Sequence, residues 1–192
     1  MCQLALVPAA GIPLGIGWRR IGFPPELRDF SSALDHVTAA GFPVVAVTAW
    51  QMLFEYARIE AGQAILVRGA AGSVGAFATQ MAKEAGASVY GTARARDIER
   101  VRALGAEPVV EGDRIGARLA SQSLDAVIDT IGGEALESTG EALRRNGIIV
   151  SVVRAPDETY LRSKGVRAAY FIVDVTRDRL DRILGDDRTR DA

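Results

Sequence analysis

The chain has 192 residues, of which 48% are apolar and 24% charged, values typical of a single folded, water-soluble domain. One cysteine, Cys2, excludes an intramolecular disulfide, and together with the one histidine, His36, it fits the ligand sets of zinc sites poorly. We therefore expect no bound metal and a cytoplasmic location. The 23 Lys and Arg residues against 24 Asp and Glu residues lack the basic excess of a nucleic-acid-binding protein, so no nucleic-acid partner is expected.

Residues 1–33 carry prolines and glycines at irregular spacing, which predicts an irregular N-terminal segment. Within it, the apolar stretch Leu4–Gly17 has no cationic segment in front and is followed by Trp18–Arg20, the wrong order for a signal peptide. The uncharged run Val37–Phe54 is interrupted by glycine and proline, so it is expected to form a buried helix and not a membrane span. The sequence thus predicts no membrane contact.

A helix is expected over residues 44–60, with Trp50, Leu53 and Phe54 facing inward. From residue 64 onward, short apolar runs alternate with segments of helical periodicity, the pattern of βαβ units. The expected strands are 64–67, 88–91, 108–110, 126–128, 148–153 and 168–173. The expected helices are 74–85, 98–104, 114–120, 135–144 and 177–184, most of them ended by a glycine: Gly86, Gly105, Gly147 and Gly185.

This order of elements predicts an α/β fold of the Rossmann type over residues 34–185, followed by a polar tail at 186–192. The sheet is expected to be doubly wound, with six parallel strands and helices on both faces. Open sheets of this kind bind ligands at the carboxyl ends of their strands, which is where site residues are expected.

A glycine-rich turn follows the first expected strand. Gly72 has no side chain to obstruct a pyrophosphate that approaches the helix N-terminus, and Gly75 allows the helix to pack tightly on the strand. Ala70 stands where the G-x-G-x-x-G fingerprint usually has its first glycine. The candidate dinucleotide-binding residues of this turn are Gly69, Ala71, Gly72, Ser73, Val74 and Gly75; the alternative is a glycine-rich turn that binds nothing.

The end of the second expected strand bears on the choice of cofactor. An NAD-selective site places an acid there for the ribose 2′-hydroxyl, but the sequence has Thr92 and Ala93, followed by Arg94 and Arg96. Arginine suits a 2′-phosphate, because its guanidinium makes paired charge-assisted hydrogen bonds. These residues predict NADP(H). Alternatively, the arginines are solvated charges at a helix start and Asp97 is merely its N-cap.

Several motifs occur in a recognisable order: Pro43–Trp50, Ala61–Val67, Gly69–Gly75, Gln80–Lys83, Leu104–Ala106, Val127–Gly133 and Arg145–Gly147. Together they resemble the nucleotide-binding half of the zinc-independent medium-chain dehydrogenase/reductases, in the NADPH:quinone oxidoreductase, or zeta-crystallin-like, branch. The resemblance covers residues 34–184. Nothing in residues 1–33 resembles the GroES-like catalytic domain of that family, so the chain is expected to be a member reduced to its cofactor domain.

The resemblance also implies roles for individual residues. Thr48 matches a hydroxyl contact on the nicotinamide side, and Thr92, Ala93 and Arg94 match the 2′-phosphate loop. The remaining implied contacts line the cofactor crevice or flank the nicotinamide ring: Thr130, Gly132, Val152, Val153, Phe171, Ile172 and Val173. For the apolar strand ends among them, the alternative is plain core packing.

The function implied by the resemblance is an NADPH-dependent oxidoreductase that reduces a quinone or an activated alkene by hydride transfer from the cofactor. No proton donor stands out. One alternative is an NADP(H)-binding module with little or no turnover, because the domain that would exclude water and position the substrate is not recognisable. Another is an oligomerisation piece. In the family the sixth strand pairs across a dimer, so a homodimer through this strand is expected.

Overall fold

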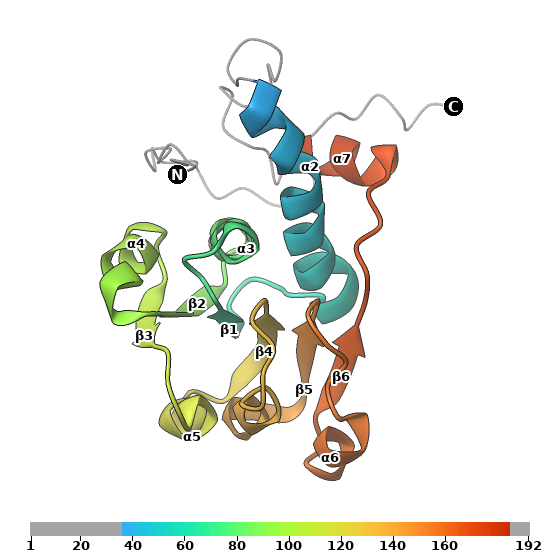
Figure 1. The fold of residues 1–192 in the computed structure, drawn as a ribbon. Coiled ribbons are helices and arrows are strands. Elements are labelled where there is room, and N and C mark those ends of the chain that lie inside the picture. Colours follow the sequence, from blue (N-terminus) through green and yellow to red (C-terminus); the bar gives the residue numbers. More distant parts are fainter. Residues whose placement is uncertain (1–35, 185–192) are drawn as a thin grey trace.

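The computed structural model describes residues 36–184 and contains one six-stranded parallel sheet (Figure 1). The strands are β1 (Ala64–Arg68), β2 (Ser88–Ala93), β3 (Glu107–Val110), β4 (Leu124–Asp129), β5 (Leu143–Ser151) and β6 (Arg167–Tyr170). Their spatial order is β3-β2-β1-β4-β5-β6, and every neighbouring pair is parallel. The predicted Rossmann-type fold is therefore confirmed; the expectations for residues 1–33, Gly185 and residues 186–192 lie outside the described range.

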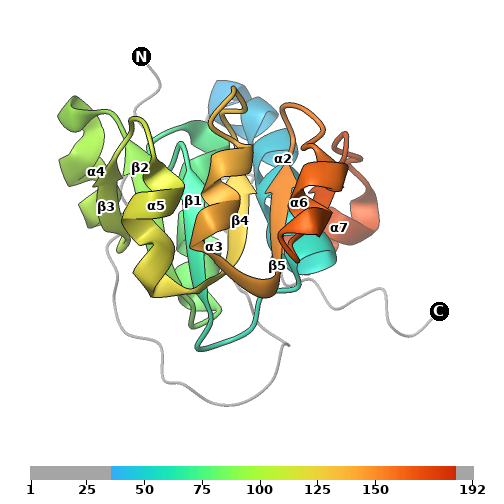
Figure 2. The same ribbon diagram turned by 90° about the horizontal axis from the view of Figure 1, so that it is seen from below.

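Helices cover both faces of the sheet (Figures 1 and 2). The first face carries α2 (His36–Trp50), α3 (Ser73–Glu84) and α4 (Ile98–Ala103), and α7 (Arg177–Leu184) lies beside α2. The opposite face carries α5 (Ile115–Leu119), the 3₁₀ helix η5 (Glu137–Ala142) and α6 (Glu158–Ser163). None of the helices in residues 36–184 is long and apolar enough to cross a membrane.

The helix expected at 44–60 is displaced relative to the prediction. It begins at His36, passes Pro43, and continues beyond Trp50 as a π-helix, η2 (Gln51–Ala57). It ends when Arg58 adopts a left-handed conformation with φ of 52°. Leu53 is fully buried as expected, whereas Trp50 and Phe54 are only half-buried against the same core.

The helix predicted at 135–144 is present but is shorter and of the 3₁₀ type. The structure has the 3₁₀ helix η5 there, and β5 already begins at Leu143. Two hydroxyls bind local backbone carbonyls, Ser138 Oγ to Ala135 O at 2.8 Å and Thr139 Oγ1 to Leu136 O at 2.5 Å. Such bonds compete with regular α-helical pairing, and Gly140 further lowers the helix propensity of the segment.

The glycine caps are confirmed at Gly86 and Gly105, both with φ of +85°. The cap expected at Gly147 is wrong, because Asn146 takes the left-handed conformation with φ of 63° and Gly147 lies inside β5. A Cβ at Gly147 would lie 2.9 Å from Arg144 O, so this glycine serves a close backbone approach. The helix α6 was not predicted from the sequence; it is capped by the Asp157 carboxylate, which accepts from the Tyr160 N–H at 2.9 Å.

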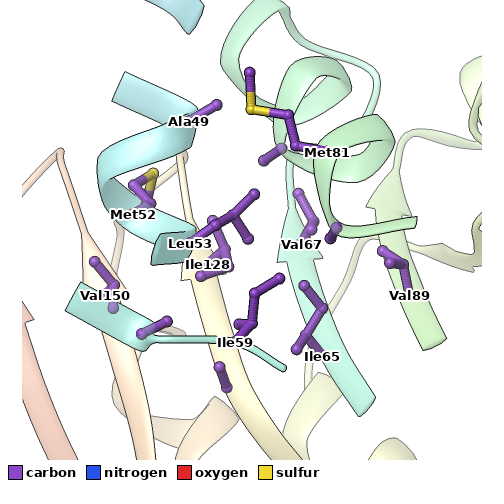
Figure 3. Packing of buried hydrophobic residues seen from close by; sticks show 14 of the residues in the cluster. Ala49, Met52, Leu53, Ile59, Ile65, Val67, Met81, Val89, Ile128 and Val150 are labelled. Carbon is purple, nitrogen blue, oxygen red and sulfur yellow. The ribbon is translucent and has the colours of Figure 1, made fainter. Parts of the chain in front are cut away.

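Alternation along the strands creates two apolar clusters, one on each face of the sheet. Figure 3 shows the first, where strand residues such as Ile65, Val67 and Ile128 pack towards Leu53 of η2 and Met81 of α3. The second cluster contains the intervening strand residues, including Leu66, Val127 and Ile149, under α5 and α6. At the carboxyl ends of the strands this second face changes from apolar to polar.

Candidate functional site

The glycine-rich turn between β1 and α3 is fixed to the end of β2. Gly69 has a φ of +76° and donates its N–H to Thr92 Oγ1 at 3.0 Å, while the Ala70 N–H donates to Thr92 O at 2.9 Å. The turn closes on itself when the Gly72 N–H donates to Gly69 O at 2.9 Å. Thr92 is fully buried, so its hydroxyl holds the turn and does not face outward.

Gly75 and Gly72 have different surroundings within this turn. A Cβ at buried Gly75 would lie 2.1 Å from Gly69 O, so the prediction that Gly75 permits tight packing is confirmed. At exposed Gly72, a Cβ would approach Gly69 O only to 3.2 Å. Gly72 is the N-cap of α3 and no side chain caps the helix, so the first N–H groups of α3 remain available to an anion.

Ala70, the departure from the glycine fingerprint, is accommodated by β2. Its methyl group is fully buried, and a Cβ at Gly91 would lie only 2.8 Å from it and 2.6 Å from Val101 Cγ1. A missing side chain in β2 therefore compensates for the additional one in the turn. The backbone of the turn keeps its tight geometry.

The loop after β2 presents two arginines. Arg94 and Arg96 are exposed and flank the start of the 3₁₀ helix η3 (Ala95–Asp97). Arg96 Nε lies 3.6 Å from Asp97 Oδ2, whereas the guanidinium of Arg94 forms no ion pair with any residue in the range 36–184. Asp97 is the N-cap of α4, but its side chain accepts no capping bond. Arg94 is free to meet an anionic group, and buried Ala93 can contribute only through its backbone.

A polar layer that the sequence pattern did not predict lies directly beneath this edge of the sheet. It consists of residues at the carboxyl ends of five strands, all on the face of the second cluster: Arg68, Thr92, Glu111, Asp129 and Ser151. The sequence signal for this layer was a charged residue directly after an apolar run: Arg68 follows AILV, and Asp129 follows AVI. In sequence, however, such residues look like the solvated ends of strands.

Arg68 is the centre of the polar layer. Its side chain is 2% exposed, and Nη1 donates to Asp129 Oδ1 at 2.8 Å and to Gly132 O at 3.1 Å. Nη2 lies 3.4 Å from Glu111 Oε1 beyond β3. Arg68 Nε and Glu111 Oε2 are buried without a partner among the described residues. One guanidinium thus joins the ends of three strands.

Asp129, the partner of Arg68, also binds the backbone of the loop after β4. Its carboxylate accepts from Ser151 Oγ at 2.7 Å, from the Gly132 N–H at 3.1 Å and from the Ile131 N–H at 3.3 Å. Buried polar groups that are paired in this way fix loop geometry. The position of the loop after β4 therefore depends on Arg68, which binds both Asp129 and Gly132 O.

Several predicted site residues lie together above this layer. Thr130 Oγ1 donates to Arg68 O at 2.7 Å, and it would lie 2.6 Å from a Cβ at Gly69. Gly132 has a φ of 72°, and a Cβ there would lie 2.8 Å from Val153 Cγ1. The loops after β1, β4 and β5 are thus in direct contact. Val153 is exposed, while Val152 packs partly on the first apolar cluster.

The predicted site residues of α2 and of the segment after β6 make other contacts and are not seen against the loops after β1, β4 and β5. The Thr48 hydroxyl donates within its own helix, to Val44 O at 2.6 Å. The Phe171 ring stacks on Tyr56 with centroids 4.3 Å apart, and Val173 packs on the first cluster, whereas Ile172 is 79% exposed. Phe171 and Val173 therefore have packing roles, and their contact with a cofactor stays a prediction.

The sequence and the fold of this chain are similar to those of known oxidoreductases. Residues 73–166 match the zinc-binding dehydrogenase family. In residues 36–184, no three His, Cys, Asp or Glu side chains are grouped as metal ligands. The spectinabilin polyketide synthase system protein NorB of Streptomyces orinoci is 34% identical over 158 residues, which cover 77% of this chain and 7% of that protein.

Two solved quinone oxidoreductases have the same fold. The enzyme from Coxiella burnetii is 31% identical with a TM-score of 0.67, over 79% of this chain and 49% of that one. The enzyme from Thermus thermophilus, whose structures include a complex with NADPH, is 26% identical with a TM-score of 0.67, over 80% of this chain and 53% of that one. The chain spans about half the length of these oxidoreductases. Residues 73–166 are therefore similar to the zinc-binding dehydrogenase family, and the fold of the described residues is similar to about half of each of these oxidoreductases.

Proposed function

We propose that this chain binds NADP(H) at the carboxyl edge of the sheet and acts as an NADPH-dependent oxidoreductase on a quinone or an activated alkene. The observation that carries the proposal is the uncapped N-terminus of α3 together with Arg94, which is exposed in the next loop and unpaired among the described residues. The NADPH complex of the related Thermus thermophilus quinone oxidoreductase and the likeness to the Coxiella burnetii enzyme support the choice of cofactor and reaction.

The residues present fit a dinucleotide phosphate. Ser73, at the exposed start of α3, offers its backbone N–H to the pyrophosphate, Gly72 leaves room beside it, and the positive end of the α3 dipole favours its negative charge. Arg94 and Arg96 would hold the 2′-phosphate with charge-assisted hydrogen bonds. When bound, the cofactor supplies the hydride. The protein holds and orients it.

The competing proposal is a binding module that holds NADP(H) with little or no turnover. To separate the two, NADPH oxidation by the full chain is followed at 340 nm with a simple quinone and with an enone. Saturable turnover that depends on the acceptor is the expected result. Binding without oxidation of NADPH would leave the module as the function and contradict the oxidoreductase proposal.

Replacement of Arg94 by serine tests the choice of cofactor. We expect R94S to weaken NADPH binding roughly tenfold or more, because a charge-assisted hydrogen bond contributes about 1.5–3 kcal/mol. NADH has no 2′-phosphate, so its affinity is expected to change by less than about twofold. R100S is the matched control, since it removes an exposed arginine on the neighbouring helix α4. Equal losses of NADPH and NADH affinity would contradict the assignment.

We further propose a cytoplasmic homodimer that assembles through β6. This strand lies at the end of the sheet and pairs with β5 on one side only among the described strands. An edge strand with free backbone groups can pair with a second copy, and Tyr170 is exposed at its end.

A further inference from the structure

Arg154, immediately beyond β5, is bound to the loop that follows β4. Its Nη2 and Nε donate to Gly133 O at 2.8 and 3.3 Å, and its Nη1 donates to Glu137 Oε1 at 2.8 Å. Nη2 also donates to Glu137 Oε2, and Nη1 to Ala155 O at 3.2 Å. The guanidinium therefore has protein partners on all three nitrogens. It joins the loop after β5 to the segment after β4, and Arg154 and Glu137 are 17 residues apart in the sequence.

Glu137 holds the other side of this contact. Besides the two bonds from Arg154, its Oε1 accepts from the Asp157 N–H at 3.0 Å, at the start of α6. The hydrogen bonds from Arg154 and from the Asp157 backbone outweigh partial burial and hold the pKa of the Glu137 carboxyl below its usual value. The carboxylate is thus charged at neutral pH. We call the Arg154–Glu137 pair the loop latch.

The latch acts on a segment that contains two consecutive glycines, Gly132 and Gly133. Gly132 and Gly133 are both in the left-handed region, with φ of 72° and 81°. Asp129 fixes the N–H of Gly132 from beneath, and Arg154 fixes the carbonyl of Gly133 from the side of β5. Between them, Gly132 lies against Val153, where a Cβ would lie 2.8 Å from Cγ1. Without the latch, the Gly133 carbonyl would keep only the Leu136 N–H, at 3.3 Å, as a donor among the described residues.

Strand order indicates which part of a bound dinucleotide lies near the latch. The pyrophosphate turn follows β1, and Arg94, the expected partner of the 2′-phosphate, follows β2 on one side of it. The latch joins the loops after β4 and β5, on the opposite side of β1. A dinucleotide that crosses the edge at β1 therefore has its nicotinamide half on the side of the latch.

We propose that the Arg154–Glu137 latch is a positioning device that holds the loops after β4 and β5 in place for the nicotinamide half of the cofactor. The inference rests on the proposed function and adds positioning residues to it. Arg154 acts through Gly133 and Val153, since its own donors are occupied. A loop ordered before binding loses less conformational entropy when the ligand arrives, which raises affinity.

The test compares NADPH with 2′,5′-ADP, which lacks the nicotinamide half, in calorimetric titrations of R154Q and E137Q. We expect each variant to bind NADPH about tenfold more weakly and 2′,5′-ADP within about twofold of the original chain. Because the two residues act as one unit, the double variant should bind NADPH no more weakly than either single variant. R162Q, which breaks the exposed Arg162–Glu158 pair on α6, is the matched control and should leave both affinities unchanged.

Three results would overturn the inference. Equal losses for NADPH and 2′,5′-ADP would show a general structural role, and unchanged NADPH binding would show that the latch has no effect on the site. If the original chain binds neither ligand, the proposed function itself fails. Since E137Q keeps an acceptor oxygen for both Arg154 and Asp157, it remains informative even where R154Q unfolds. Thermal unfolding of every variant identifies that case.

Discussion

Replacement of Gly75 by alanine is expected to destabilise the domain by about 3 kcal/mol or more and to abolish cofactor binding. The added Cβ would lie 2.1 Å from Gly69 O and 2.7 Å from Gly69 C, so backbone atoms on both sides of the turn would have to separate. Overpacking against backbone cannot be relieved by a rotamer change. The helix α3 and the turn would therefore lose their present contact.

Gly72→Ala is the matched comparison within the same turn. Its Cβ would meet a single atom, Gly69 O, at 3.2 Å, so the stability cost should stay below about 1 kcal/mol. The methyl group would nevertheless project at the exposed N-cap of α3, where the pyrophosphate is expected to approach. Urea unfolding and NADPH titration of both variants separate the two effects. Similar stability losses, or undiminished NADPH binding by G72A, would contradict these roles.

Replacement of Arg68 by methionine is expected to lower the free energy of unfolding by about 3–5 kcal/mol, because the buried carboxylate of Asp129 would lose its cationic partner. Glu111 would lose its only ion pair among the described residues. The loop after β4 is held by Asp129, so cofactor affinity should fall together with stability. Chemical denaturation and NADPH titration measure the two losses.

An exposed ion pair provides the control for Arg68. Arg182 and Asp178 lie one turn apart on α7, at 2.9 Å, and both side chains are 62% exposed. Solvent screens such a pair, so R182M should change stability by less than about 1 kcal/mol. If R68M unfolded at the same denaturant concentration as R182M, the polar layer would not have the stabilising role assigned to it.

Much of the fold could be predicted because local sequence and global structure agree. The strands β1, β4 and β5 contain the apolar runs that predicted them, and left-handed glycines at Gly86 and Gly105 end helices as their positions indicated. The helix predicted at 135–144 is shorter and of the 3₁₀ type, because the serine, threonine and glycine residues in it weaken regular α-helical pairing. The π-helical end of α2 leaves no comparable signal in the sequence.

Prediction of the site was uneven for a different reason. The glycine turn is a local feature, so its tight packing at Gly75 could be foreseen from spacing alone. The polar layer around Arg68 and the loop latch join residues from different strands, and only the register of β1, β4 and β5 brings them together. Thr92 illustrates the limit: its position was identified, but its hydroxyl binds Gly69 and does not face outward.

The most direct test of cofactor binding is a calorimetric titration of the full chain with NADPH, repeated with NADH and with the G72A variant. The proposed site predicts saturable binding of one NADPH per chain, weaker binding of NADH because of Arg94, and loss of NADPH binding in G72A. Absence of saturable NADPH binding, or equal binding by the original chain and G72A, would contradict the assignment of the turn after β1 as a dinucleotide site.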